Sequence, residues 1–260
     1  DLNNGLTAPA GNSSYDISGE ARLRNYYVSG GESKAIDARA RVNFSFNVNE
    51  NAGAVVGLTG FETWGAQTAD SAAGNTSGIG TASGADTRVE QAFYWANDLF
   101  GDGGTTTLGR KHFTLGSGRI LGSDDWDQAP SQQTGLWYNH EAGGANFQAF
   151  FLNSQDDAGL SGGLYPATDY FGFTFDYTWQ GGDTIGDINF KPYVLSAREN
   201  GLNLEDGWYL GAEFSGEVFG FGWSGEWASM DEISAGVGGG SAYVLNTTVG
   251  LSALESLPGV

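Results

Sequence analysis

In the stretch AIDARARVNFSFNV, residues 35–48, two kinds of side chain alternate from Ile36 to Val48. The apolar or small set is Ile36, Ala38, Ala40, Val42, Phe44, Phe46 and Val48. The polar set is Asp37, Arg39, Arg41, Asn43, Ser45 and Asn47. Because successive side chains of a strand point to opposite faces, this period of two predicts a strand with one apolar and one polar face.

The same alternation recurs along the chain and predicts about twelve strands. The other expected strands are Tyr15–Tyr26, Gly53–Trp64, Val89–Asn97, Thr105–Lys111, Thr134–His140, Ala145–Asn153, Tyr170–Trp179, Asp187–Ala197, Trp208–Glu217, Phe219–Trp227 and Ala242–Ser252. No segment carries a long apolar stripe at helical spacing with caps around it. The sequence therefore predicts an all-β fold.

The connectors alternate in length, and this alternation indicates a topology. The short ones are Glu50–Ala52, Leu99–Gly104, Glu141–Gly144, Gln180–Gly186 and Glu217–Phe219. The connectors between them are mostly longer and polar: Ala66–Thr87, His112–Gln133, Ser154–Ala167, Arg198–Gly207 and Ser229–Ser241. The first connector of this set, Ser29–Lys34, is short. Tight turns at one rim and long loops at the other are typical of outer-membrane β-barrels. We therefore expect residues 1–260 to form one transmembrane, antiparallel, up-and-down barrel, with both visible termini on the periplasmic side.

Composition excludes several classes of protein. The chain has no cysteine, so it has neither disulfides nor thiolate metal ligands. A formal net charge of −20 disfavours a nucleic-acid partner, whose phosphates would be repelled. The chain has 43 glycines and is 13% aromatic. In a barrel we expect glycine and the aromatic residues to divide between the lumen face and the lipid face. A soluble β-sandwich or a glycine-rich adhesin is the alternative, since their strands also alternate.

Aromatic residues gather near the ends of the expected strands. Amphipathic rings are favoured at lipid–water interfaces, where they form girdles around a barrel. The predicted girdle consists of Trp64, Trp95, Trp137, Tyr177, Trp179, Trp208 and Trp227.

The segment Leu108–Trp126 reads LGRKHFTLGSGRILGSDDW. Its L-G-R start, followed by G-x-G-R-I and then D-W, resembles porin-like barrels of the alginate-export type. The resemblance implies an outer-membrane barrel of up to 16–18 strands. The final residues, Leu257 to Val260, contain the turn signal Pro258-Gly259. We therefore expect the strands to continue, so that twelve is a lower bound.

Charged residues on the polar faces are the candidate functional residues, because rings of lumen charge select ions by sign. The predicted pore-lining basic residues are Arg22, Arg24, Arg39, Arg41, Arg110 and Lys191. The predicted pore-lining acidic residues are Glu20, Asp37, Glu90, Asp176, Glu213 and Glu226. One hypothesis is a basic wall that faces an acidic wall across the pore. The other is that the arginines pair locally with Glu20 and Asp37 across the strands.

Two loop features have a functional and a simpler interpretation. Ala66–Thr87, rich in Ala, Gly, Ser and Thr, either folds inward as a constriction or lies on the surface, and we favour the surface. Oxygen ligands suit Ca²⁺, so acidic loop clusters are candidate calcium sites, although a solvated acidic rim is favoured. These clusters are Asp124, Asp125 and Asp127, and Asp156 and Asp157. No other cofactor is expected.

The sequence therefore predicts an outer-membrane porin, a non-enzymatic channel for ions and small polar solutes. Its expected partners are membrane lipid and lipopolysaccharide, and a homotrimer is the expected assembly. Two alternatives stay open: a structural or adhesive barrel without transport, and a lipase-type barrel enzyme. The enzyme is disfavoured because neither His112 nor His140 stands in a lipase-type sequence motif.

Overall fold

The structure, a computed structural model, describes residues 13–27, 34–65, 86–118, 121–123, 132–154, 168–182, 185–199, 207–218, 221–230 and 240–249. Twelve strands lie in these ranges. They are β1 (Ser14–Tyr27), β2 (Lys34–Asn49), β3 (Ala52–Gly65), β4 (Asp86–Asn97), β5 (Thr105–Lys111), β6 (Gln133–Ala142), β7 (Ala145–Ser154), β8 (Thr168–Trp179), β9 (Ile185–Glu199), β10 (Gly207–Val218), β11 (Phe221–Met230) and β12 (Gly240–Val249). In the described part of the chain, no helix is long and apolar enough to cross a membrane.

The strands are connected in the simplest antiparallel order. Each strand is hydrogen-bonded to its neighbours along the chain, so the order in the sheet runs from β1 to β12. Every strand pair whose register is described is antiparallel, as in β1–β2, where Ser14 pairs with Asn47 and Tyr27 with Lys34. These observations confirm the predicted all-β, up-and-down fold.

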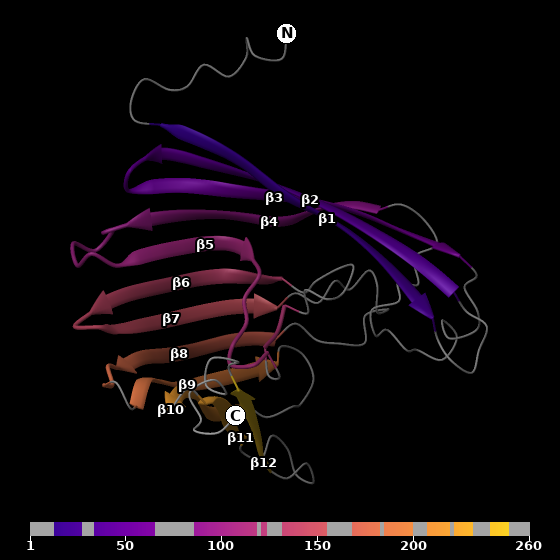
Figure 1. The fold of residues 1–260 in the computed structure, drawn as a ribbon. Helices are drawn as coiled ribbons and strands as arrows, with labels where there is room; N and C mark the ends of the chain where they lie inside the picture. The colour runs from indigo at the N-terminus through magenta and orange to yellow at the C-terminus, as the bar shows by residue number, and fades with distance from the viewer. Residues whose placement is uncertain are drawn as a thin grey trace. The chain divides into compact units, whose positions relative to one another are not determined.

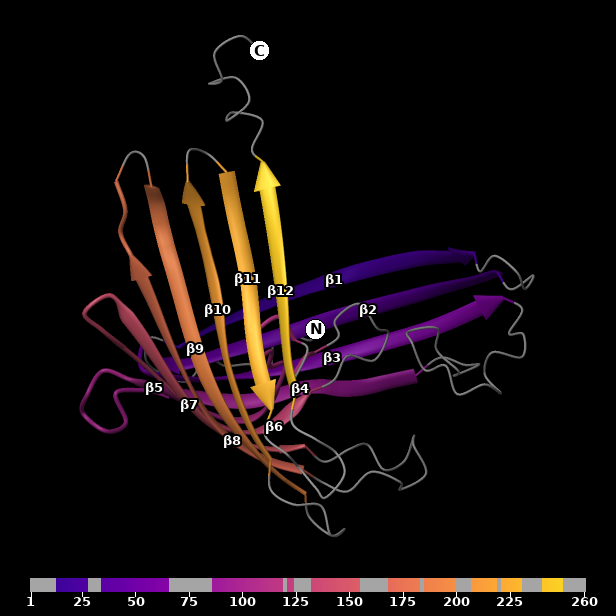
Figure 2. The same ribbon diagram turned by 90° about the horizontal axis from the view of Figure 1, so that it is seen from below.

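The chain divides into two compact units. The first unit is built largely on β1 to β4 and includes Thr107–Phe113. The second is built largely on β6 to β12 and includes Asp98–Thr106 and Thr114–Leu121. Within each unit, consecutive strands lie side by side (Figures 1 and 2). The expectation of a single barrel domain stays a prediction.

In the first unit the apolar face of the strands is the exposed one. Its exposed side chains include Tyr15, Ile17, Leu23, Val42, Phe46, Val48, Leu58, Val89 and Tyr94. Charged and polar residues on the opposite face are buried: Asp37 is 1% exposed, Arg39 2% and Glu90 0%. This distribution is the reverse of that in a water-soluble protein, which rarely exposes a large continuous apolar face.

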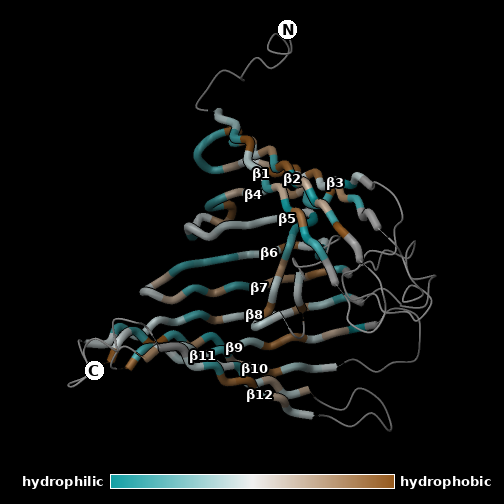
Figure 3. Tube along the Cα trace, turned by 45° about the vertical axis from the view of Figure 1, so that its right-hand side comes forward, coloured by the Kyte–Doolittle hydropathy of each residue, from teal (hydrophilic) through white to brown (hydrophobic). Residues whose placement is uncertain are grey.

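The second unit also exposes an apolar face. Its exposed side chains include Leu136, Phe151, Phe171, Phe175, Phe190, Leu210, Tyr243 and Leu245. Polar and apolar residues alternate along its strands, and the hydropathy colours change accordingly along β10 to β12 (Figure 3). The opposite face differs from that of the first unit because it buries an apolar patch of Trp137, Phe150, Leu152, Tyr193 and Leu195.

Some aromatic rings lie on the same face as a glycine and cover it from the neighbouring strand. The ring of Trp95 covers Gly53, its partner in the β3–β4 register, and a Cβ at Gly53 would lie 2.7 Å from the ring. In the same way the Phe150 ring covers Gly172 on the neighbouring strand. The expected division therefore holds for Phe171 and Phe175, which are exposed on the face opposite the buried Gly172. Trp95 and Phe150 are exceptions to it. A glycine leaves room for a large ring on the next strand, which stabilises a strand that lacks a side chain of its own.

Candidate functional site

The polar face of the first unit is occupied by a network of ion pairs. Arg24 donates hydrogen bonds to Asp37, its register partner, from Nε to Oδ1 at 2.9 Å and to Oδ2 at 3.1 Å, and from Nη2 to Oδ2 at 2.7 Å. Arg39 Nε donates to Glu20 Oε1 at 3.0 Å. Forked guanidinium–carboxylate pairs of this kind are the strong form of the interaction. The local pairing of the second hypothesis is therefore present.

Glu90 is the centre of this network. Arg41 binds it with both ends of its guanidinium, Nε to Oε2 at 2.6 Å and Nη2 to Oε1 at 2.8 Å. The Thr59 hydroxyl also donates to Oε2, and His112 Nε2 lies 3.2 Å from Oε1. A fully buried carboxylate is tolerated only with such partners, because desolvation of its charge is costly. Glu90 thus joins β2, β3, β4 and the segment after β5.

These contacts do not match the hypothesis of a basic wall that faces an acidic wall, because residues assigned to opposite walls are in contact. Glu90, assigned to the acidic wall, lies among the arginines, in contact with Arg41. Lys191, assigned to the basic side, lies 3.8 Å from Glu213. Positive and negative charges are therefore mixed within each unit. Of the remaining basic candidates, Arg22 is half-buried opposite Arg39 in the register, and Arg110 is half-buried on β5.

In the second unit, the acidic residues form a row across neighbouring strands. Lys191, Glu213 and Glu226 are register partners on β9, β10 and β11. Asp176 on β8 accepts a hydrogen bond from Asn189 Nδ2 at 2.5 Å. With one lysine among three carboxylates, this face has negative charge, which favours cations in an aqueous pore.

A segment between β5 and β6 is bound to this acidic face. Leu115 N donates to Leu121 O at 2.8 Å, and Gly118 N donates to Leu115 O at 3.1 Å, so the chain turns sharply at Leu115–Gly118. The Ser117 backbone N donates to Glu226 Oε2 at 3.2 Å, and the Ser117 hydroxyl donates to the same atom. We call residues Leu115–Gly118 together with Leu121 the docked turn.

The docked turn fits this face closely. Gly116 has a φ of +64°, and a Cβ there would overlap the Glu226 carboxylate, so glycine is needed for both reasons. Tyr193 on β9 donates its hydroxyl to Glu226 Oε1 at 2.7 Å, which fixes the carboxylate from the other side. Leu115 and Leu121 are 1% and 5% exposed. Burial of each leucine stabilises the docked position by about 1.5–3 kcal/mol.

The sequence did not indicate that this segment lies against the acidic face. The segment Ala66–Thr87, considered as an inward constriction, lies almost wholly outside the described residues, as do the acidic clusters proposed for calcium. A signal for the turn itself was nevertheless present in the quoted motif, where Gly116-Ser117-Gly118 supplies two positive-φ glycines around one hydroxyl. Among the described residues, no group of histidine, aspartate and glutamate side chains could hold a metal ion.

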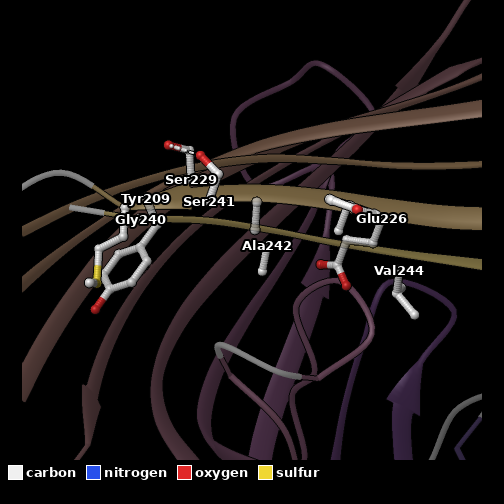
Figure 4. A pocket seen from close by; sticks show the side chains of 10 residues that line it. Tyr209, Glu226, Ser229, Gly240, Ser241, Ala242 and Val244 are labelled. Carbon is white, nitrogen blue, oxygen red and sulfur yellow. Dashed lines mark hydrogen bonds between the residues drawn. The ribbon is translucent and has the colours of Figure 1, made fainter.

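A groove of about 340 Å³ lies beside Glu226 on β10 to β12. Its lining includes Tyr209, Ala228, Met230, Gly240, Ala242 and Val244. Figure 4 shows Tyr209 and Glu226 projecting from one side of the strands, with Ser229 and Ser241 on the other. The groove therefore combines apolar walls with a carboxylate at one end.

The predicted girdle is distributed over both faces. Tyr177, Trp179, Trp208 and Trp227 belong to the exposed apolar face. Trp137 departs from the prediction because it is fully buried, and so does Trp95, whose ring lies over Gly53 opposite the polar Asn47. The side chain of Trp64 lies outside the described part of the structure.

Comparisons with known proteins complete these observations. No family model matches the chain, and no curated protein matches it. Among solved structures it is similar to OccK2 (OpdF) of Pseudomonas aeruginosa, with 11% identity, a TM-score of 0.49, and coverage of 94% of this chain and 78% of that one. It is also similar to OmpF of Salmonella typhi, solved with daunomycin, with 12% identity, a TM-score of 0.40, and coverage of 91% and 86%. Neither likeness is strong enough to establish a function.

Proposed function

We propose that the chain is a bacterial outer-membrane channel through which ions and small polar solutes diffuse passively. The reversed polarity of its sheet carries the proposal. Leu23, Ile17 and Tyr243 are 72%, 59% and 86% exposed on one face, while Asp37 and Glu90 are almost completely buried on the other. In water the apolar face would drive aggregation, whereas in lipid it is the stable arrangement.

The secondary structure supports the same environment. Lipid offers no hydrogen bonds to the backbone, so strands in a bilayer need neighbouring strands as partners, and each of β2 to β11 has two. A tilted crossing requires about 9–11 residues per strand. Most of the strands, such as β6 and β7 with 10 residues each, reach that length.

The docked turn supports a channel with a narrowed passage. It lies on the face that carries Glu213 and Glu226, the face that would line the lumen. A segment held there reduces the open cross-section and places Ser117 beside the acidic row. The channel is therefore expected to conduct in small steps and to favour cations in the part formed by the second unit.

The test is electrical recording from the purified full chain in planar lipid bilayers. Discrete conductance steps are expected, together with swelling of liposomes that contain the protein when they are placed in small sugars. Co-flotation with the liposomes serves as the insertion control. Insertion without conductance or swelling would instead favour the structural barrel. Failure to insert at all would refute the membrane location.

Several finer points belong to the same proposal. The lipid-facing surface would contact membrane lipid and lipopolysaccharide, the termini would lie in the periplasm, and copies of the chain would assemble as a homotrimer. A relationship to the alginate-export type rests only on the Leu108–Trp126 motif. We propose a function without catalysis, since His112 is engaged near Glu90 and His140 stacks on Tyr138 at a centroid distance of 6.4 Å.

A further inference from the structure

The turn between β4 and β5 differs in its side chains from the β2–β3 and β6–β7 turns. It contains Leu99 and Phe100, which are 61% and 70% exposed. The β6–β7 turn has only Gly143 and Gly144 at its tip, and the connector after β8 begins with Gln180-Gly181-Gly182. Two exposed large apolar side chains at a polar rim require an explanation.

The backbone of this turn is tightly held. Asp98 N donates to Gly104 O at 2.7 Å, and Gly103 N donates to the Asp98 Oδ1 atom at 2.8 Å. Gly104 N donates to Asp102 Oδ1 at 3.0 Å. Positive φ values at Asp98, Gly101 and Gly103 are part of this geometry. The exposed side chains therefore project from a fixed loop.

The tip is also connected to the outward face of β6. The Phe100 ring meets the Tyr138 ring edge to face at a centroid distance of 5.8 Å, and the Tyr138 hydroxyl donates to Asp102 Oδ2. Tyr138 lies two residues after the exposed Leu136, so both belong to the apolar face. Gly104 leaves space for the Tyr138 ring, since a Cβ there would overlap it. The apolar surface of β6 thus continues onto the turn.

We infer that the β4–β5 turn is a lipid anchor, in which Leu99 and Phe100 insert into the phospholipid interface on the short-turn side of the membrane. This inference rests on the proposed function. Continuity with the outward apolar face favours lipid as the occupant. The placement of charge agrees, because Asp98 and Asp102 lie on the same turn and keep its backbone at the aqueous boundary. An apolar tip with a charged base is the arrangement that an interface stabilises.

The absence of cysteine permits a direct test with single-cysteine variants of the full chain. Phe100→Cys, the control Gln180→Cys, and Leu136→Cys on the apolar face would each be labelled with an environment-sensitive fluorophore. The proteins would be inserted into liposomes with and without brominated phosphatidylcholine. Labels at positions 100 and 136 are expected to be quenched at least twofold by the brominated lipid, while the label at position 180 is quenched by aqueous iodide.

The labels at the three positions distinguish failure of the proposed function from failure of the lipid anchor alone. A label at position 136 that lipid does not quench would refute the proposed function itself. Lipid quenching at 136 combined with iodide quenching at 100 would refute only the anchor. Protection at 100 that appears only at high protein-to-lipid ratios would mean that a second copy of the chain, and not lipid, covers the turn. In the Phe100→Cys background, Tyr138→Phe is expected to reduce lipid quenching at 100, because the hydrogen bond to Asp102 is lost while the ring remains.

Discussion

The two units cover the polar side of their strands in different ways. In the first unit, side chains of β1 to β4 fill that face with paired charges around Glu90. In the second, a separate piece of chain, the docked turn, lies against the face and is held by Glu226. The first arrangement consists of strand residues and cannot be removed without disturbing the strands. The second is a segment outside the strands, so we expect that it can be released while the strands stay paired.

Because of this difference, we expect the first unit to determine the stability of the fold and the docked turn to determine the conductance of the proposed channel. Variants in the ion-pair network should destabilise the fold and change conductance little. Variants at the docked turn should change conductance strongly and the fold less. Each of the following experiments tests one side of that contrast.

The largest effect on stability is expected from Glu90→Gln. This change leaves Arg41 and His112 beside a neutral amide in a buried position, which costs about 3–5 kcal/mol of unfolding free energy. Urea unfolding in detergent micelles, followed by tryptophan fluorescence, measures the loss. Glu50→Gln is the control, because Glu50 is exposed in the β2–β3 turn and the loss of its charge should cost at most about 1 kcal/mol. Equal losses from the two variants would contradict the central place of Glu90.

Release of the docked turn is expected to have the second-largest energetic effect. Glu226→Gln removes a charged acceptor from Ser117 and Tyr193, at a cost of about 1.5–3 kcal/mol. Single-channel conductance should rise, because the turn no longer stays on the wall. Ser117→Ala should give the same rise, and the double variant should add little further, since both changes break one contact. Unchanged conductance in all three variants would show that the turn does not narrow the passage.

A smaller loss is expected where a ring covers a glycine. A Cβ at Gly211 would overlap the Tyr193 ring, so Gly211→Ala should cost about 1–3 kcal/mol and displace the Tyr193 hydroxyl from Glu226. Gly240→Ala is the control, since no atom lies within 4 Å of a Cβ at that position. Thermal unfolding of the two variants would measure the difference. A Gly211 variant as stable as the Gly240 variant would argue against close ring–glycine packing.

The smallest effect is a pH dependence at the β4–β5 turn. The Tyr138 hydroxyl, and secondly the Gly104 N–H, hold the pKa of the Asp102 carboxyl below its usual value. A lowered pKa in the folded state adds stability that is present above the usual carboxyl pKa of about 3.9 and is lost as the pH falls through the lowered value. Tyr138→Phe should therefore unfold at slightly lower urea than the parent at pH 7, and the gap should close in strong acid. A gap that stays constant to the lowest pH would exclude Asp102 as its source.

The strands could be predicted from the sequence because their signal is local. In residues 35–48 every second side chain is polar, so the period alone defines a strand and its two faces. The β6–β7 turn could also be predicted from the sequence, since Gly143 and Gly144 supply the positive φ values that a two-residue hairpin requires.

The two girdle residues that were assigned to the wrong face lie where the alternation of apolar and polar residues is interrupted. Trp95 ends the run Phe93-Tyr94-Trp95, and Trp137 lies between Leu136 and Tyr138. Consecutive apolar residues occupy both faces of a strand, so their sequence does not show which of them points outward. In the structure the exposed positions belong to Tyr94 and Leu136, and the two tryptophans take the other face.

The docked turn could not be predicted for a different reason. Its contacts join Ser117 to Glu226, which are 109 residues apart, and such a pairing leaves no periodic signal. The same holds for Glu90 and Arg41, at a separation of 49 residues. The sequence showed which charged residues would share a face, but the choice of partners depends on the register of strands that lie between them.

The position of Glu90 has a consequence for the order of assembly. The β1–β2 hairpin by itself can satisfy Arg24 with Asp37 and Arg39 with Glu20. Glu90, in contrast, requires Arg41 from β2, Thr59 from β3 and His112 from the segment after β5. If strands entered a bilayer one hairpin at a time, this carboxylate would cross the hydrocarbon with an incomplete set of partners. For the membrane location proposed above, we therefore expect β1 to β5 to come together before or during insertion, as one cooperative step.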